Sequence, residues 1–194
     1  MPILLTAALS VLLAWLRGAP PAELGTIRLR WLALPLVAFG IQLAAFVRFA
    51  HIFEGAAFAL HVGSLALLVL FLAANLLYRS LIAVAAGVLL NLAVIAANHG
   101  YMPVRVADMQ RAGFYDVAAT LERDGHFQKS SVLDSGTSLW FLGDVIPVPL
   151  PYGPDRLISA GDVLIALGTF AFVQEALVSR RRPHGARRET LQPA

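Results

Sequence analysis

The stretch that decides the fold is LIAVAAGVLLNLAVIAA, residues 81–97, an apolar segment with a single amide in its middle. Its length meets the lower limit of the roughly 17–25 residues that a helix needs to cross a bilayer. One stripe of the segment takes every fourth position and contains two small residues, the amide and an isoleucine: Ala83, Gly87, Asn91 and Ile95. Such a stripe lets neighbouring helices approach closely and hydrogen-bond to each other. The segment therefore predicts a helix packed within a membrane bundle.

Four other apolar segments occupy residues 2–16, 31–50, 56–77 and 157–178. The whole chain is 58% hydrophobic and 14% charged, whereas soluble domains average about 45–50% and about 25%. Its 194 residues suffice for one compact bundle but not for two domains of ordinary size. We therefore predict an all-α integral membrane protein, a bundle of five transmembrane helices. Residues 1–178 would form the membrane domain and residues 179–194 a basic tail.

The loop charges predict how this bundle is oriented. Arginines gather in alternate loops and in the tail: Arg17, Arg28, Arg30, Arg79, Arg180, Arg181, Arg182, Arg187 and Arg188. The basic residues of the long 98–156 loop are instead balanced by acids. The positive-inside rule then places the C-terminus in the cytoplasm, and the N-terminus and the 98–156 loop on the extracytoplasmic side. We expect a multi-pass protein of the cell membrane, with membrane lipid as a partner.

Charge and cysteine usage argue against several other classes of function. The net charge of +3 comes from the tail and short loops rather than from a patch or an amphipathic helix, so we expect no nucleic-acid partner. The chain has no cysteine, which removes thiolate nucleophiles and cysteine-based metal sites. His99, His126 and Asp134 lack the HExxH-like spacing of a metal site. We therefore predict neither a metal nor a cofactor.

Polar side chains within or beside apolar helices are the first candidates for a functional site. In the predicted topology, polar residues from several helices lie at a similar depth near the outer side, next to the acids of the long loop. This candidate outer-side cluster contains Arg48, His61, Asn91, Asn98, His99, Asp134, Asp144 and Asp162. Its members either converge on a cavity that opens outward, or bond separately to different neighbours.

Two parts of this cluster also have structural explanations. Residues 159–162 read SAGD, a capping-box-like pattern before an apolar run, in which Asp162 would stabilise the first turn of a helix. Residues 98–100 read NHG and end the 81–97 segment. Gly100 suits a left-handed helix terminator, and Pro103 cannot continue the helix.

The loop stretch SVLDSGTSLWFLGDVIPVPLPYG, residues 131–153, contains the tetrapeptide Asp-Ser-Gly-Thr of aspartic proteases at residues 134–137. Such an enzyme needs two carboxylates that share one proton. The chain has no second copy of the tetrapeptide, and no apolar strand precedes this one.

Asp144 follows Gly143, as in the Gly-Asp element of intramembrane aspartyl proteases, where the acid lies in a helix. Here the alternating prolines from Pro147 onward forbid a regular helix and favour extended backbone. A Pro-rich lid that folds back over the outer end of the bundle explains the stretch better. Within it, Asp144 would pair with an arginine or with backbone N–H groups.

Four short boxes follow one another along the chain: Asn98-x-Gly100-x-Met102-Pro103-Val104, Leu133-Asp134 with Thr137, Leu142-Gly143-Asp144-x-Ile146-Pro147, and Ser159-x-Gly161-Asp162. Their order resembles a family of small bacterial integral membrane proteins that is classed as a domain of unknown function. The resemblance covers nearly the whole chain and implies a five-span bacterial membrane protein, without a known activity or cofactor. It also implies that Ser135 and Gly136 lie outside the family pattern, so that the protease-like tetrapeptide is incidental.

No complete catalytic constellation is visible, so the sequence names no catalytic residue. We predict a non-enzymatic accessory or binding subunit of a membrane assembly, with its functional surface on the extracytoplasmic side and other membrane protein subunits as partners. One alternative is a membrane-embedded hydrolase or acyl-type transferase at the outer leaflet, in which an acid of the candidate cluster would act with His99. The other is a small solute or ion transporter centred on His61, Asn91 and Asp162.

Overall fold

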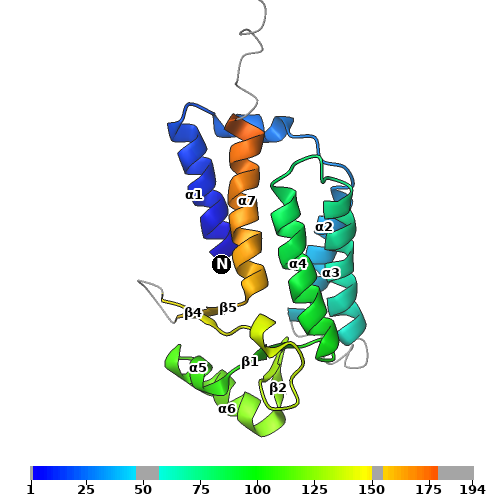
Figure 1. The fold of residues 1–194 in the computed structure, drawn as a ribbon, viewed down its shortest axis with the longest axis vertical. Coiled ribbons are helices and arrows are strands. Elements are labelled where there is room, and N and C mark those ends of the chain that lie inside the picture. The colour runs from blue at the N-terminus through cyan, green and yellow to red at the C-terminus, as the bar shows by residue number, and fades with distance from the viewer. Residues whose placement is uncertain (1, 47–56, 150–154, 179–194) are drawn as a thin grey trace, which may run out of the picture.

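The computed structural model describes residues 2–46, 57–149 and 155–178. Five long helices run side by side along its longest axis (Figure 1): α1 (Pro2–Leu16), α2 (Ala33–Phe46), α3 (Ala57–Ala73), α4 (Leu81–Ala97) and α7 (Ala160–Val178). Each of the five predicted apolar segments contains one of these helices. All of them are apolar around most of their circumference, so the polar side chains that they carry need partners on neighbouring elements.

The helices do not pack in chain order, because α7 lies between α1 and α4 while α3 lies between α4 and α2. Hydrogen bonds join α1 to α7 across 160 positions of sequence: Ser10 Oγ donates to the carbonyl oxygen of Phe170 at 2.8 Å. Gln174 Nε2 donates to the carbonyl oxygen of Ser10 at 2.7 Å. The last described helix is therefore an inner one, packed between the first helix and α4.

Glycines bring α4 and α7 into close contact. A Cβ atom built on Gly161 would lie 2.6 Å from the carbonyl oxygen of Gly87, and one built on Gly168 would lie 2.7 Å from the backbone nitrogen of Val84. At the far end of this contact, Glu175 of α7 accepts a hydrogen bond from the backbone N–H of Ser80 at 3.0 Å. An acid from α7 thus satisfies a free donor at the N-terminus of α4.

Two buried apolar clusters hold the bundle together. The larger one lies between α3 and α4 and reaches the strand that follows α4: Leu65, Leu72, Leu81, Val84, Val88, Val94, Ile95 and Met102. The smaller one joins α1 to α7 and to the loop after α1: Ala14, Ala19, Val173 and Leu177. Burial of these side chains supplies the main favourable term for folding.

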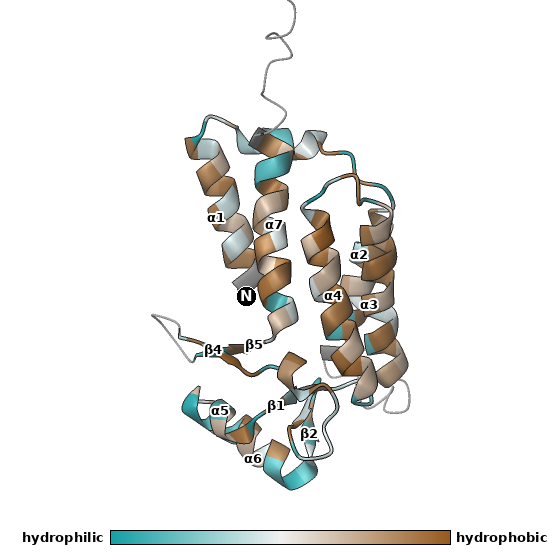
Figure 2. Cartoon of the chain, viewed as in Figure 1, coloured by the Kyte–Doolittle hydropathy of each residue, from teal (hydrophilic) through white to brown (hydrophobic). Residues whose placement is uncertain are grey.

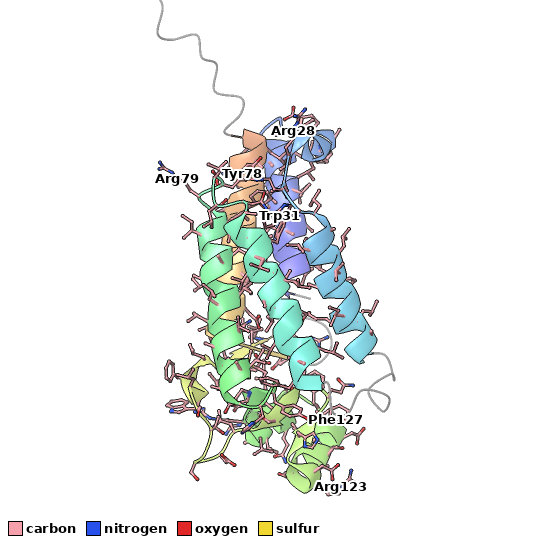
Figure 3. All side chains as sticks on the ribbon, turned by 90° about the vertical axis from the view of Figure 1, so that its right-hand side faces the viewer. Arg28, Trp31, Tyr78, Arg79, Arg123 and Phe127 are labelled. Carbon is pink, nitrogen blue, oxygen red and sulfur yellow. The ribbon has the colours of Figure 1, made fainter. Side chains whose placement is uncertain are left out.

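The connections between helices gather at the two ends of the bundle. One end carries the 3₁₀ helix η1 (Pro21–Thr26) and the turn after α3, and Arg28 and Arg79 lie there (Figure 3). The opposite end carries the described residues between 98 and 159, which we call the cap and which include Arg123 and Phe127. Hydrophilic residues concentrate in the cap and at the other end, while the helices between them are mostly hydrophobic (Figure 2).

The cap contains short elements of both kinds. Its helices are α5 (Val106–Arg111), α6 (Tyr115–Asp124) and the 3₁₀ helix η3 (Trp140–Leu142). Its strands are β1 (Met102–Val104), β2 (His126–Phe127), β3 (Ser130–Val132), β4 (Ile146–Val148) and β5 (Arg156–Ile158). In the first sheet β3 pairs parallel with β1 and antiparallel with β2, and β4 pairs antiparallel with β5 in the second.

The sequence prediction of an all-α fold is wrong, because the cap contains these five strands. The short strands arise where the residues resist helix formation. Pro103 and Pro147 lie inside β1 and β4, and proline is compatible with a short strand only where it donates no ladder bond. Gly125, with φ of 77°, ends α6 in the left-handed conformation and turns the chain into β2.

The prediction of five transmembrane helices is also contradicted. Among the described residues, one helix, Ala160–Leu177 in α7, is long and apolar enough to cross a membrane. The other four apolar helices have at most 17 residues. At 1.5 Å per residue these helices fall short of the roughly 30 Å hydrocarbon core. The segments 2–16 and 81–97 are helical throughout but have only 15 and 17 residues. In the segment 56–77 the count of apolar residues overestimates the helix, because residues 74–77 form turns.

The end of α3 illustrates this overestimate. The sequence predicts an apolar segment to residue 77, but the helix ends at Ala73. Asn75 is buried beyond it, where its amide nitrogen donates to the carbonyl oxygen of Phe71 at 2.7 Å and its amide oxygen accepts from the backbone N–H of Arg30 at 2.8 Å. The asparagine thereby stops the helix and fixes the loop before α2 against it.

Candidate functional site

A cavity of about 410 Å³ lies within the bundle near the cap, bounded by α2, α3, α4 and α7. Its walls are apolar: Pro35, Leu65, Leu68, Phe71, Leu72, Val84, Val88, Ile95, Met102 and Ile165. Its polar lining comes from all four of these helices and from the cap: Gln42, His61, Asn91, Lys129, Asp144 and Asp162. The cavity therefore has an apolar body and a group of ionisable and amide side chains.

A closed hydrogen-bond network fixes Asp162 at the start of α7. Asp162 Oδ1 accepts from Asn91 Nδ2 at 3.0 Å, and Asp162 Oδ2 accepts from the backbone N–H of Ser159 at 3.3 Å. Ser159 Oγ donates to Asn91 Oδ1 at 2.9 Å and accepts from the backbone N–H of Asp162 at 3.0 Å. This reciprocal pairing is the capping box that the sequence predicts, extended to Asn91 on α4.

Asp144 reaches the cavity from the cap, between η3 and β4. Its backbone N–H donates to the carbonyl oxygen of Pro103 at 2.9 Å. Gly143 makes this approach possible, since a Cβ atom there would lie 2.5 Å from the same oxygen. The carboxylate itself is not satisfied in this way: Asp144 Oδ1 is buried and has no hydrogen-bond partner among the described residues. The arginine or backbone partner that the sequence predicts for this carboxylate is absent from its Oδ1 within that part of the chain.

The surroundings of Asp144 favour its protonated form. Burial raises the pKa of Asp144 to about 7, the negative charge of Asp162 contributes in the same direction, and the positive charge of Lys129 opposes both. A carboxyl group with this pKa exchanges a proton near neutral pH, whereas an ordinary aspartate does so near pH 4. Asp144 can therefore either donate or accept a hydrogen bond toward a molecule in the cavity.

His61 is held in one orientation at the same end of the cavity. Its Nδ1 lies 2.7 Å from the carbonyl oxygen of Gly100, so the neutral ring carries its proton on Nδ1 and leaves Nε2 as an acceptor. Ser64 Oγ donates to the carbonyl oxygen of His61 at 2.7 Å and accepts from Gln42 Nε2 at 3.2 Å. Two polar residues, one helical turn apart on α3, thus connect α2 to the end of α4.

The structure brings together four of the eight residues of the candidate outer-side cluster: His61, Asn91, Asp144 and Asp162. Asn98 has a different position, since its side chain donates to the carbonyl oxygen of Ser138 at 2.8 Å and so ties the end of α4 to the cap. His99 is exposed, with a left-handed φ of 56°. Arg48 lies outside the described residues.

Asp134 belongs to a surface turn that explains the protease-like tetrapeptide. Asp134 Oδ1 accepts from the backbone N–H of Gly136 at 2.8 Å and from Thr137 Oγ1 at 3.1 Å. An aspartate that bonds to the backbone two residues later is a common turn motif. Asp134 is exposed and borders a shallow hollow of about 350 Å³ beside Arg105 and Trp140. It does not line the cavity that contains Asp144.

Metal binding finds no support in the described residues, where no three histidine or acidic side chains lie close enough to hold an ion. In particular, the set His99, His126 and Asp134 does not converge. The ionisable groups of the cavity are two acids, one histidine and one lysine. Such a set can exchange protons and bind a charged or hydrogen-bonding ligand.

Sequence reasoning missed Lys129 and Gln42 as cavity residues. Gln42 could have been found, because it is a long amide within an otherwise apolar helix and needs a partner there. No sequence signal places Lys129 in the cavity. It follows β2 in the cap, and its position depends on how β3 pairs with β1.

Fold and site together define a mainly helical protein with a small mixed cap and a cavity whose acids come from both parts. The chain belongs to the family of unknown function DUF5317, which matches it over residues 26–174. This confirms the predicted resemblance to a family of unknown function. No curated protein matches the chain, and no solved structure matches it.

The matched range includes α2, α3, α4, the cap and most of α7, and hence every residue that lines the cavity. The four boxes quoted above meet at this end of the molecule. They supply the stop of α4, the Asp134 turn, the Gly143–Asp144 approach to β1, and the network of Ser159 and Asp162. Each box thus has a structural reason, and Asp144 is the box residue whose buried Oδ1 has no hydrogen-bond partner in the part of the chain that the structure describes.

Proposed function

We propose that this protein is a non-enzymatic binding protein of a membrane, and that its cavity holds part of a small amphiphilic molecule. The observation that carries this proposal is the apolar cavity of about 410 Å³ with Asp144 unsatisfied at its polar end. Ligand sites typically measure about 300–1,000 Å³ and combine apolar walls with a few convergent polar groups. An amphiphile matches both halves of this lining.

Binding is a better match to these residues than catalysis. Asp162 is fully engaged in the network with Asn91 and Ser159, which suits a positioning group more than a reacting one. His99, the base of the alternative hydrolase, is exposed and does not line the cavity. A hydrolase or acyl transferase commonly uses a hydroxyl nucleophile with a base beside it, and no serine, threonine or tyrosine is among the described residues that line the cavity.

The outer surface supports a membrane location. Large apolar side chains are exposed along α1 and α2: Leu4, Leu5, Leu9, Leu12, Leu16, Leu36, Val37, Phe39 and Leu43. Apolar patches of this kind mark contact with a membrane or another protein. The helix α7 has the length and composition to cross a bilayer, and basic residues follow it in the tail. By the positive-inside rule we place the tail in the cytoplasm and the cap outside.

Ligand occupancy can be tested with a pair of matched variants. Leu68 lines the cavity, while Leu70 of the same helix points outward and is 53% exposed. We expect that the full-length protein, extracted in mild detergent, carries a small molecule that native mass spectrometry detects. Leu68→Trp should remove this molecule by filling the cavity, and Leu70→Trp should retain it. Equal occupancy in both variants would contradict binding in the cavity.

Location and orientation can be tested separately. Since the chain has no cysteine, Gln128→Cys in the cap and Thr26→Cys at the opposite end introduce single labelling sites. We expect the protein in the membrane fraction after an alkaline wash, with Gln128→Cys labelled by an impermeant maleimide in intact cells and Thr26→Cys labelled only after permeabilisation. The reverse pattern would overturn the orientation, and recovery in the washed supernatant would overturn the location.

A further inference from the structure

We propose that the polar end of the cavity binds the ammonium group of an alkylamine-type ligand, with Asp144 as its counter-ion and the apolar walls around its alkyl chain. This inference rests on the proposed function and names the chemical class of the molecule that is bound.

Asp162 already has hydrogen-bond partners within the protein. Both of its carboxylate oxygens accept hydrogen bonds, from Asn91 Nδ2 and from the backbone N–H of Ser159. Asn91 Oδ1 is in turn occupied by Ser159 Oγ. Donors on the protein therefore already occupy both carboxylate oxygens of Asp162 beside the cavity.

Asp144 is fixed in position, but its carboxylate is not satisfied as that of Asp162 is. Its main chain is held against β1 by the bond to Pro103, yet its Oδ1 is buried without a hydrogen-bond partner among the described residues. Leaving a buried acceptor unsatisfied is unfavourable, more so when it is charged. A ligand that supplies a charged donor here would remove this cost, which favours a cation over a neutral molecule.

Negative and accepting groups predominate around Asp144. His61 uses its Nδ1 proton on the carbonyl oxygen of Gly100 and presents Nε2 as an acceptor in its neutral form. The charged groups facing Asp144 are Asp162 from α7 and Lys129 from the cap. Two acids and an acceptor nitrogen outweigh a single lysine, so an anionic head group is disfavoured and a group rich in N–H donors is favoured.

An organic cation suits this cavity better than a metal ion does. A metal site would need at least three ligating side chains together, and no such group exists among the described residues. The rest of the cavity is lined by leucine, valine, isoleucine, methionine and phenylalanine. This lining suits an alkyl or aryl chain, whose transfer from water contributes about 0.8 kcal/mol per buried methylene group.

The test uses three probes of equal chain length on the full-length protein in mild detergent: octylamine, 1-octanol and octanoate. Binding is measured by titration calorimetry and by the shift in Tm, and the Leu68→Trp variant gives the background from partition into micelles. We expect octylamine to bind most tightly, 1-octanol more weakly and octanoate least. Octanol or octanoate binding as tightly as octylamine would overturn the amine assignment.

Substitution of the counter-ion gives the second arm. Asp144→Asn should lower the affinity for octylamine about tenfold to a hundredfold, the range expected for loss of a buried charge-assisted hydrogen bond. It should leave 1-octanol nearly unaffected. Asp134→Asn is the matched control, because Asp134 is exposed in the same cap and does not line the cavity. Equal octylamine affinity in Asp144→Asn and Asp134→Asn would overturn the role of Asp144.

The wild-type protein provides a third arm that requires no substitution. Octylamine stays protonated below about pH 10, so its binding depends on whether Asp144 is ionised. Since the pKa of Asp144 is about 7, affinity should fall about tenfold per pH unit below pH 7 and level off above it. An affinity that does not change between pH 5 and pH 8 would contradict an ion pair with Asp144.

These outcomes separate the ligand class from the proposed function. If 1-octanol or octanoate binds wild type but not Leu68→Trp, and octylamine does not, the cavity binds amphiphiles while the amine inference fails. If none of the probes binds and no small molecule co-purifies, both the inference and the proposed function fail.

Discussion

The two acids that line the cavity, Asp144 and Asp162, differ in how the protein treats their charge. Asp162 stands at the glycine-lined contact of α4 with α7, and both of its oxygens accept hydrogen bonds. Asp144 enters from the cap, and its Oδ1 has no hydrogen-bond partner among the described residues. Burial alone therefore does not distinguish the two acids. What distinguishes Asp144 is the shortage of donors around it.

The largest expected effect concerns the pH dependence of stability. The pKa of Asp144 rises from 3.8 to about 7 on folding. The stability that this proton contributes is fully present below about pH 4 and is lost as the pH rises through 7. At 1.36 kcal/mol per pH unit, the loss is on the order of 4 kcal/mol.

Asp144→Asn should remove most of this dependence. The free energy of unfolding, measured between pH 4 and pH 8 by denaturant titration with tryptophan fluorescence, should change less in this variant than in wild type. Asp134→Asn should keep the wild-type dependence. An unchanged pH profile in Asp144→Asn would show that its carboxyl group is not the unsatisfied acid described here.

The next effect should come from the tight contact on the Asp162 side. In Gly161→Ala the added methyl group would collide with Asn91 Oδ1 and lie 2.6 Å from the carbonyl oxygen of Gly87. We expect a loss of about 3 kcal/mol in the free energy of unfolding, since overpacking typically costs about 1–3 kcal/mol.

Gly63→Ala is the matched control for this substitution. Gly63 lies within α3, and a Cβ atom there would meet no other atom within 4 Å. Replacing a helical glycine by alanine at such a position should raise stability by up to about 1 kcal/mol. If both variants are equally stable, the α4–α7 contact is looser than the structure describes.

A smaller effect is expected from Ser159→Ala. This change removes the cap of α7 and leaves Asn91 Oδ1 without the donor that lies 2.9 Å away. Loss of an N-cap costs about 1 kcal/mol, and an unsatisfied buried acceptor adds a similar amount. We expect a loss of about 2 kcal/mol by denaturant titration, against almost none for the exposed Ser135→Ala. Similar values for the two serines would remove Ser159 from the network.

The smallest effect separates the surface acid from both cavity acids. Asp134→Ala removes the two hydrogen bonds that close its turn and should cost about 1 kcal/mol. Asp134→Asn keeps an acceptor oxygen in place and should restore most of that stability. Thermal unfolding of the two variants measures the difference. A large loss in Asp134→Asn would indicate that the charge itself matters.

The helical part of the fold was largely predictable from the sequence. Apolar segments, and the polar residues that interrupt or end them, are local signals. Each of the five apolar segments forms a helix, and the capping box at Ser159 begins α7 as predicted. Helix lengths were not predictable with the same accuracy. The end of α3 depends on Asn75 bonding to Arg30, 45 positions away in the sequence, which no local pattern contains.

The site was predictable only where residues lie on the helices. His61, Asn91 and Asp162 appear as polar interruptions of apolar runs, and helical spacing places them at one end of the bundle. Lys129 and the unsatisfied state of Asp144 depend on the cap, whose parallel pairing of β1 with β3 joins segments 28 positions apart, as in Met102 with Ser130. Asp134 was overrated because its tetrapeptide is also a turn sequence.

The position of α7 between α1 and α4 has a consequence for biosynthesis. The helix that α1 and α4 both pack against is synthesised after both of them. Until α7 has been synthesised, the apolar faces of Ala14 on α1 and Val84 on α4 lack the helix that covers them in the folded protein. During that time lipid or a chaperone must cover them. Contacts between distant segments form slowly. A nascent chain halted before residue 160 should therefore remain open to proteolysis, and resistance should appear only once α7 has been synthesised.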